Sequence, residues 1–187
     1  MKIFISGGCK NGKSYHAQHM AKAQKADHLY YVATMKPVDK EDDIRIKRHQ
    51  DEREGWGFIT VEQPVNIAEI LDKCSQDGSF LLDSLTALLA NEMFLPDGSI
   101  NDKATDQIIT GLGLVLTGIN NIVIVSDYIY SDAMIYDPLT EKYRKALADI
   151  DREAAWLCDT VLEVSYTNVI AHKADPAYLG VKFSELY

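Results

Sequence analysis

Residues 7–14 read Gly-Gly-Cys-Lys-Asn-Gly-Lys-Ser, directly after the apolar run Met1–Ser6 (MKIFIS) and before an Ala- and Lys-rich stretch. The spacing G-x-x-x-x-G-K-S between a strand and a helix is that of a phosphate-binding P-loop. Glycines let the backbone curl so that several N–H groups point at phosphate oxygens, and a helix beginning near Lys13 directs its positive end at the same oxygens. The motif therefore predicts a nucleoside triphosphate site made of Gly7, Gly8, Cys9, Lys10, Asn11, Gly12, Lys13 and Ser14, with a plain tight turn as the alternative.

Two side chains of this loop carry specific chemistry. Lys13 is expected to reach the β- and γ-phosphates, and the Ser14 hydroxyl is expected to hold Mg²⁺. Cys9 occupies a variable position of the loop, where a small residue is tolerated.

Strand-like and helical patterns alternate along the chain. Apolar runs of strand length occur at 3–6, 29–33, 58–61, 80–83, 122–126 and 161–164. Helical patterns fill the gaps at 13–24, 41–53, 66–75, 84–94, 103–118 and 138–157. The alternation predicts an α/β fold in which a mostly parallel sheet has helices on both faces, formed as one domain over residues 1–187. The segment after about residue 165 has weak periodicity and can be a hairpin, a loop over the site or a docking tail.

Composition restricts the class of protein. The net charge is −9 and no basic face is evident, so nucleic acid is not an expected partner. The three cysteines are far apart and suggest no disulfide framework, which fits a reducing compartment. No apolar run reaches the length needed to span a membrane, and no signal peptide precedes the first predicted strand. We therefore expect a cytoplasmic protein that does not enter a membrane.

Acidic residues follow two of the predicted strands. Ligands of parallel α/β sheets bind at the carboxyl ends of the strands. Asp83 ends the run FLLD and is expected to hold Mg²⁺ next to the P-loop hydroxyl, with helix capping as the alternative. Asp127 and Asp132 follow the run IVIVS and can position substrate or metal, although turns also favour Asp.

His49 lies four residues from Arg45 and four from Arg53, so the three share one face of a predicted helix. Cationic neighbours favour the neutral, nucleophilic imidazole, and the arginines can clamp phosphate. His49 can therefore attack a phosphorus atom, but an ordinary exposed helix histidine remains open on these residues alone. His16 and His19 lack a third ligand with convincing spacing and are interpreted as helix-surface residues.

The chain resembles the bifunctional adenosylcobinamide kinase/adenosylcobinamide-phosphate guanylyltransferases of cobalamin biosynthesis. The resemblance rests on motifs in the first half of the chain, in the family's order. Besides the P-loop these are Tyr31-Val32-Ala33-Thr34, Arg45-Ile46-Lys47-Arg48-His49 with Arg53, Trp56, Thr60-Val61-Glu62, and Asp83-Ser84-Leu85-Thr86 with Asn91.

The resemblance implies a RecA-like P-loop fold, a homo-oligomer that is a trimer in the better-known members, and two reactions. In the first, ATP or GTP phosphorylates the corrinoid acceptor. In the second, His49 accepts GMP from GTP and passes it to the phosphorylated acceptor. It also adds Glu62 to the expected nucleotide-binding residues, beside Arg45, Arg53 and Asp83.

The second half departs from the family's pattern. Where the family has N-E-V-G after the fifth strand, this chain has Asp127-Tyr128-Ile129-Tyr130-Ser131-Asp132. Two alternatives therefore stay open: a P-loop kinase for another small acceptor without guanylyltransferase activity, and a non-catalytic nucleotide-sensing protein.

Overall fold

The computed structural model describes residues 1–37, 53–130 and 132–174, together with Lys40, Ile44, Ile46, Lys47, Gln50 and Asp51. Within these residues seven strands form one sheet in the order β3-β2-β4-β5-β1-β6-β7. Their bounds are Lys2–Gly7 (β1), Leu29–Ala33 (β2), Phe58–Glu62 (β3), Ser79–Asp83 (β4), Asn121–Asp127 (β5), Thr160–Ser165 (β6) and Asn168–Lys173 (β7). All neighbouring strands are parallel except β6 and β7. The predicted sheet is confirmed, with β7 as an added antiparallel edge strand.

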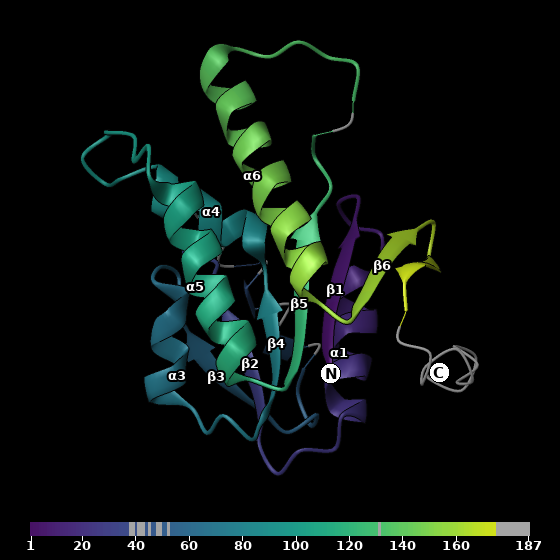
Figure 1. The fold of residues 1–187 in the computed structure, drawn as a ribbon. Helices are drawn as coiled ribbons and strands as arrows, with labels where there is room; N and C mark the ends of the chain where they lie inside the picture. Colours follow the sequence, from purple (N-terminus) through teal and green to yellow (C-terminus); the bar gives the residue numbers. More distant parts are fainter. Residues whose placement is uncertain are drawn as a thin grey trace.

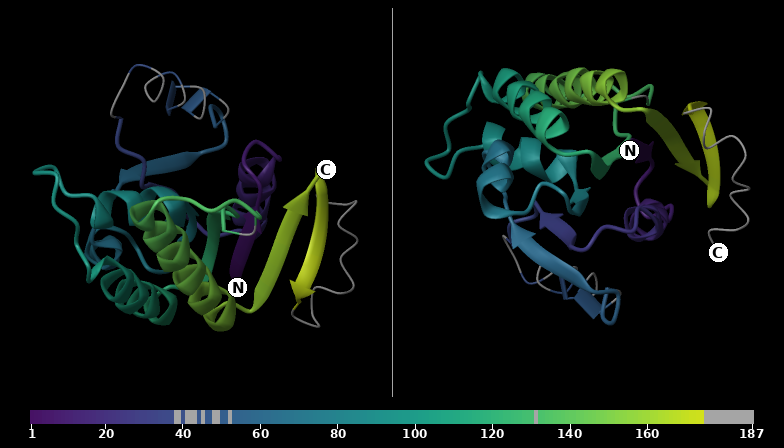
Figure 2. Two further views of the ribbon diagram at one scale, coloured as in Figure 1. Left: turned by 90° about the horizontal axis from the view of Figure 1, so that it is seen from above. Right: turned by 60° about the horizontal axis from the view of Figure 1, so that its bottom comes forward.

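Helices cover both faces of this sheet (Figures 1 and 2). Among the described residues the α-helices with assigned bounds are Lys13–Ala23 (α1), Ile70–Lys73 (α3), Leu85–Met93 (α4), Ala104–Gly118 (α5) and Pro138–Leu157 (α6). Helix α1 lies on the opposite face from α4, α5 and α6, as the view from above shows. The predicted helix at 66–75 is shorter than expected, because it begins as a 3₁₀ turn at Ile67–Glu69 after Asn66 in the left-handed conformation.

The two faces have separate apolar cores whose strand residues alternate. Phe4, Phe80, Leu82 and Ile124 pack against α4, α5 and α6. Ile5, Leu81, Val123 and Val125 pack against α1 on the other face. Because successive strand residues point to opposite faces, the nearly continuous apolar runs of the central strands are explained by burial on both sides.

The described part of the segment after Ser165, up to residue 174, forms a hairpin with β6, one of the three outcomes left open. Tyr166 and Thr167 both have positive φ, of 49° and 65°, and connect β6 to β7. Two central residues with positive φ give a turn whose twist matches that of the strands it joins. Within the described residues no helix has both the length and the apolar character needed to cross a membrane.

Candidate functional site at the carboxyl ends of the strands

The predicted phosphate loop connects β1 to α1. Gly12 adopts φ 91° and precedes the first residue of α1, a conformation that favours glycine. A side chain at Gly7 would collide with the Val164 carbonyl oxygen and the Asn11 amide, and the same Asn11 amide donates to Val164 O. Gly8, Cys9, Lys10 and Gly12 are exposed. The loop is thus packed against β6 on its inner side and open to solvent on its outer side.

Lys13 is buried under this loop, with its residue only 5% exposed. Its ammonium donates to Gly8 O at 2.7 Å and forms an ion pair of 2.9 Å with Asp127 Oδ1. A buried ammonium needs such partners, because an unpaired charge is costly away from water. Asp127 in turn is fixed through its backbone, whose N–H donates to Thr86 Oγ1 at 2.9 Å.

Asp83 ends β4, and its carboxylate accepts a hydrogen bond from a residue of β2. The Tyr31 hydroxyl donates to Asp83 Oδ2 at 2.9 Å. The cap of α4 is Ser84, whose Oγ accepts from Ala87 N at 3.3 Å. The capping role considered for Asp83 therefore belongs to its neighbour, and Asp83 is left with a second carboxylate oxygen for other partners.

The ends of β2 and β4 are joined by further hydrogen bonds. Thr34 Oγ1 accepts from Ser84 N at 2.7 Å and donates to Ser84 O at 2.8 Å. The Asn91 side chain donates to Thr34 O at 2.7 Å and to Pro64 O at 3.1 Å. Motifs that are far apart in the sequence thus form one bonded unit. Sequence reasoning found Tyr31, Thr34 and Asn91 only as parts of motifs, because their bonding depends on contacts between distant segments.

Arg53 lies beside this unit. Its guanidinium carbon is 3.5 Å from the centroid of the Tyr31 ring, and the residue is 8% exposed. Such a stack is a favourable contact for a desolvated cation. The predicted cation Arg53 and the predicted metal ligand Asp83 therefore contact the same tyrosine.

The neighbouring segment is held against α1 by aromatic contacts. The ring centroids of His19 and Trp56 are 4.6 Å apart, and the Lys22 ammonium is 5.0 Å from the Trp56 ring. The interpretation of His16 and His19 as surface residues is wrong for His16, which is 8% exposed. Burial lowers the pKa of both histidines. The sequence did not reveal this, because one hydrogen-bond partner of His16 is the backbone of Thr167, more than 140 residues later.

Glu62 ends β3, the edge strand, and is exposed. Four strand spacings separate β3 from β1 in the sheet order, which is about 19 Å. Glu62 therefore lies at the same edge of the sheet as the P-loop but too far away to contact phosphates held there. His49 and Arg45 lie outside the described residues.

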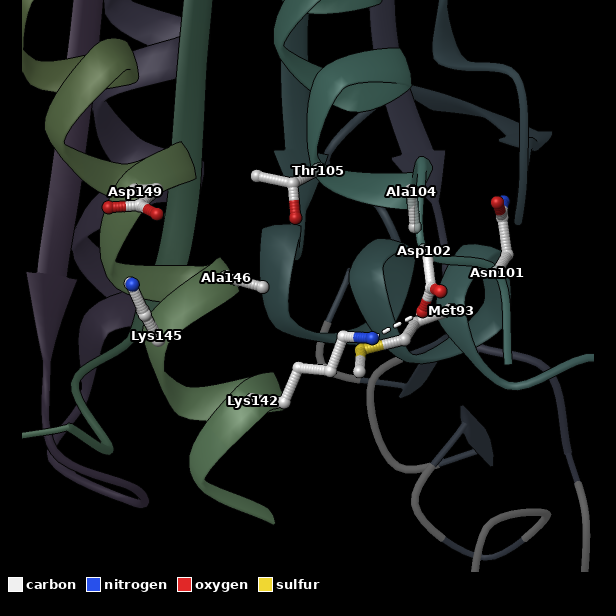
Figure 3. A pocket seen from close by; sticks show the side chains of 9 residues that line it. All are labelled: Met93, Asn101, Asp102, Ala104, Thr105, Lys142, Lys145, Ala146 and Asp149. Carbon is white, nitrogen blue, oxygen red and sulfur yellow. Dashed lines mark hydrogen bonds and ion pairs between the residues drawn. The ribbon is translucent and has the colours of Figure 1, made fainter. Parts of the chain in front are cut away.

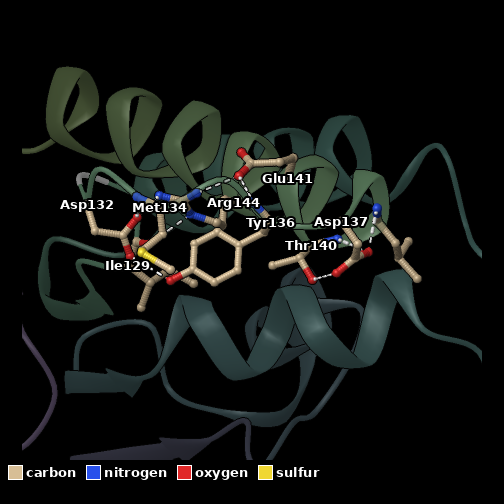
Figure 4. A network of polar contacts seen from close by, with 9 residues as sticks. Ile129, Asp132, Met134, Tyr136, Asp137, Thr140, Glu141 and Arg144 are labelled. Carbon is tan, nitrogen blue, oxygen red and sulfur yellow. Dashed lines mark hydrogen bonds and ion pairs between the residues drawn. The ribbon is translucent and has the colours of Figure 1, made fainter.

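The segment after β5 is ordered by Arg144 of α6, which is 7% exposed (Figure 4). Its guanidinium donates to Asp132 at 2.8 Å, to Glu141 at 2.7 Å and to Ile129 O at 3.1 Å, and it stacks on Tyr136. The hydrogen bond from Tyr136 lowers the pKa of Asp132, and Arg144 adds to this effect. Asp132 thus stabilises the loop, whereas Asp127 contacts the P-loop lysine.

Asp151 is buried beneath the start of this segment and is 2% exposed. Its Oδ2 accepts from the Tyr130 hydroxyl at 3.0 Å. Burial raises the pKa of Asp151 to about 7, against the opposing effect of the hydrogen bond from Tyr130. The carboxyl therefore titrates near neutrality, close behind Asp127.

A pocket of about 240 Å³ lies elsewhere, among α4, α5 and α6 (Figure 3). Lys142 and Asp102 form an ion pair in it. None of the described residues that were predicted to bind nucleotide lines this pocket, which therefore lies apart from the P-loop and Asp83.

The oxygen donors predicted for Mg²⁺ suit that ion. Mg²⁺ is commonly held by one or two carboxylates together with substrate phosphates and water, and not by an all-protein cage. Asp83 and Ser14 supply one carboxylate and one hydroxyl. The described residues contain no group of three or more His, Cys, Asp or Glu placed to hold a metal ion. The donor set therefore fits an ion that arrives with a nucleotide.

Solved structures with low sequence identity share this fold. A KaiC-like protein from Pyrococcus horikoshii is 13% identical with a TM-score of 0.51, covering 94% of this chain and 79% of the other. An ATPase of the type III secretion system of pathogenic bacteria is 12% identical with a TM-score of 0.55, covering 99% and 59%. The fold is that of a P-loop NTPase.

Two curated proteins match about half of the chain. Both are called bifunctional adenosylcobalamin biosynthesis protein CobU. The protein from Salmonella typhimurium is 29% identical over 107 residues, 57% of this chain and 58% of its own. The protein from Escherichia coli is 31% identical over 109 residues, 57% of this chain and 56% of its own. The matched part therefore spans less than two thirds of the length of these relatives.

A family model covers far more of the chain. The model described as cobinamide kinase / cobinamide phosphate guanyltransferase matches residues 3–169, which include the P-loop, the bonded ends of β2 and β4, and the whole of α6. The chain therefore belongs to the cobinamide kinase / cobinamide phosphate guanyltransferase family.

Proposed function

We propose that this protein phosphorylates adenosylcobinamide with a nucleoside triphosphate and then transfers GMP from GTP to the product, giving adenosylcobinamide-GDP. The observation that carries the proposal is the bonded unit of Tyr31, Thr34, Asp83, Ser84 and Asn91, which lies at the same sheet edge as the P-loop. These residues belong to the motifs by which the chain resembles its family, and family membership supports the same activity.

In the first reaction the residues of the P-loop bind the triphosphate. The loop's N–H groups and the positive end of α1 bind phosphate oxygens, and Lys13 neutralises charge on the terminal groups. Mg²⁺ held by Ser14 and Asp83 would supply further charge neutralisation when bound. The stack of Arg53 on Tyr31 keeps a cation close to Asp83, where it can balance the carboxylate or bind a phosphate.

In the second reaction His49 is the proposed nucleophile. Its nitrogen would form a bond to the α-phosphorus of GTP while the bond to the bridging oxygen breaks, and the electron pair leaves with pyrophosphate. The phosphate of the acceptor would then displace the GMP group from nitrogen. Arg45 and Arg53 are proposed to bind the phosphates, and Glu62 is proposed to bind the sugar or base, because its distance from the P-loop excludes contact with the phosphates held there.

Labelling with GTP separates this proposal from its alternatives. We expect α-labelled GTP with Mg²⁺ to leave an acid-labile, base-stable label on the wild type and on His172→Ala, but not on His49→Ala. His172 is an exposed histidine paired with Glu163 and serves as the matched control. Label retained in His49→Ala would exclude His49 as the nucleophile.

A second candidate is a kinase that lacks the guanylyl transfer. The segment 127–132, where the family's N-E-V-G is replaced and Arg144 orders a different loop, favours it. It predicts ATP turnover on addition of cobinamide, or of another small hydroxyl compound, without any label from GTP. Tight nucleotide binding with no turnover on any acceptor would instead indicate a nucleotide sensor.

We also propose that the protein acts as a homo-oligomer, on the strength of the family resemblance, with a trimer as the expected state. Light scattering coupled to size-exclusion chromatography gives the mass directly. A mass near 21 kDa, that of one chain, would exclude it.

A further inference from the structure

Asp127 lies at the carboxyl end of β5 and has no role in the reactions proposed above. Strand β5 lies between β1 and β4, so its carboxyl end separates the P-loop from Asp83. Asp127 is in register with Gly7, whereas Asp83 is in register with Val125. Strand β5 therefore extends two residues, about 7 Å, beyond the level of Asp83. A triphosphate held by the P-loop with its Mg²⁺ at Asp83 would have Asp127 beside its terminal phosphate.

Asp127 is also rigidly placed and still accessible. Its N–H donates to Thr86 Oγ1 at 2.9 Å, and the following N–H of Tyr128 donates to Gly7 O at 2.8 Å. The side chain of Asp127 keeps 32% of its surface exposed, whereas that of Lys13 keeps 6%. A group held on a strand end by two backbone bonds can be positioned well for chemistry, and its exposure lets a second molecule reach it.

The other carboxylates named above at the carboxyl ends of the strands are placed or paired differently. Asp83 accepts the Tyr31 hydroxyl, Asp132 is held by Arg144 and Tyr136, and Asp151 is 2% exposed. Glu62 ends β3, which is four strand spacings from β1. Asp127 pairs with Lys13, the lysine that a triphosphate would also bind. The carboxylate and the triphosphate therefore compete for one ammonium. Binding of the triphosphate would thus weaken the ion pair between Lys13 and Asp127. The carboxylate of Asp127 would then face the terminal phosphate, with the Lys13 ammonium bound to that phosphate.

We propose that Asp127 accepts the proton of the hydroxyl that attacks the terminal phosphate, after the triphosphate has taken over Lys13. This proposal rests on the kinase half of the proposed function. The attacking oxygen forms a bond to the γ-phosphorus, and the bond from that phosphorus to the β–γ bridging oxygen breaks. The electron pair stays on the nucleoside diphosphate, next to Lys13, and the proton of the hydroxyl passes to an oxygen of Asp127. An aspartate with this task is known chemistry in phosphoryl transfer.

The test compares Asp127→Asn and Asp127→Glu with the wild type. The matched control is Asp102→Asn, which removes a carboxylate from another lysine pair, that with Lys142 in the distant pocket. ADP·Mg²⁺ affinity is measured by calorimetry, and turnover of ATP is measured with cobinamide and with water alone. Thermal denaturation of each variant checks that it is folded.

We expect Asp127→Asn to bind ADP at least as tightly as the wild type, because a competitor for Lys13 is gone. Its kcat should fall about 100- to 1,000-fold with little change in the KM for ATP, a loss within the range that general acid–base catalysis typically contributes. Asp127→Glu should recover at least tenfold of that loss, and Asp102→Asn should match the wild type. A kcat of Asp127→Asn within threefold of the wild type, or a loss that follows weaker ADP binding, would overturn the proposal.

Failure of the kinase assignment has its own signature. If the wild type hydrolyses ATP but does not phosphorylate cobinamide, the proposed function is contradicted. The role of Asp127 is then tested with the same variants in the hydrolysis of ATP, where water supplies the attacking hydroxyl. A wild type that binds ATP and turns over neither acceptor overturns the role of Asp127 as well.

Discussion

Tyr31 joins two charged groups of opposite sign. Its hydroxyl donates to Asp83, and its ring lies against the guanidinium of Arg53. The sequence predicted both charged residues as parts of a nucleotide site, on separate grounds. It gave no role to the tyrosine, because an aromatic residue in a strand is usually explained by packing alone. Arg53 and Asp83 lie 22 and 52 positions from Tyr31 in the sequence. Contacts over such separations are beyond the range of any local sequence pattern.

Asp83→Asn tests the metal role against a folding role. Because Ser84 caps α4, loss of the Asp83 charge should change the melting temperature by less than about 3 °C. The Mg²⁺ concentration needed for half-maximal turnover should rise about 10- to 100-fold, because a direct oxygen donor is weakened. Tyr31→Phe keeps the carboxylate and should have the smaller effect. A lower melting temperature with a normal Mg²⁺ requirement would contradict the metal role.

Lys13→Ala removes the only side chain of the loop that is predicted to contact the terminal phosphates. Hydrogen bonds to charged groups contribute about 1.5–3 kcal/mol, so ATP affinity should fall about 10- to 100-fold and turnover should be lost. Lys22→Ala, on the same helix but over Trp56, is the matched control. Equal kinetics of Lys13→Ala and the wild type would count against the P-loop interpretation.

Elements were predictable where short-range signals suffice. The six predicted strands are apolar runs of four or five residues. Burial on two faces accounts for the signal in β1, β2, β4 and β5, whereas β3 is mostly exposed and gave the weaker pattern. The hairpin of β6 and β7 was only one of three possibilities, because Tyr166 and Thr167 are not the Asn-Gly type of pair that marks such a turn. Arg144 likewise has three polar partners from residues 3 to 15 positions away, which no helical periodicity reveals.

The start of α6 was predicted from Asp137-Pro138 and can be tested as a cap. Asp137 Oδ1 accepts from Leu139 N at 3.0 Å and from Thr140 N at 3.1 Å, and hydrogen bonds from Thr140 lower its pKa. Asp137→Ala should reduce the free energy of unfolding by about 1 kcal/mol, a typical value for a lost N-cap. Urea denaturation measures it, with the exposed Asp77→Ala as the control. Equal midpoints of these two variants would show that the cap contributes nothing to stability.

At the scale of the whole molecule, the buried carboxyl of Asp151 makes the free energy of unfolding depend on pH. Its pKa of about 7 lies well above that of an unfolded Asp, about 3.9. Between these values the folded protein keeps a proton that the unfolded chain has lost, so this group lowers the free energy of unfolding as pH rises from about 4 to about 7. Nothing in the sequence indicates this pH dependence, since Asp151 lies in a charged stretch of an amphipathic helix whose buried face is known only from the packing.

Asp151→Asn keeps the shape of the side chain and removes the titration. Relative to the wild type, the variant should gain about 1 kcal/mol or more in free energy of unfolding at pH 8, where the wild type holds a buried carboxylate, and less at pH 5, where that group is protonated. Urea denaturation at the two pH values measures the difference, and Asp77→Asn should show the same stability relative to the wild type at both. Comparing each variant with the wild type at one pH removes the contribution of His16 and His19, whose lowered pKa values favour the opposite trend. A gain for Asp151→Asn that is equal at pH 5 and pH 8 would mean that Asp151 does not hold its proton in the folded protein.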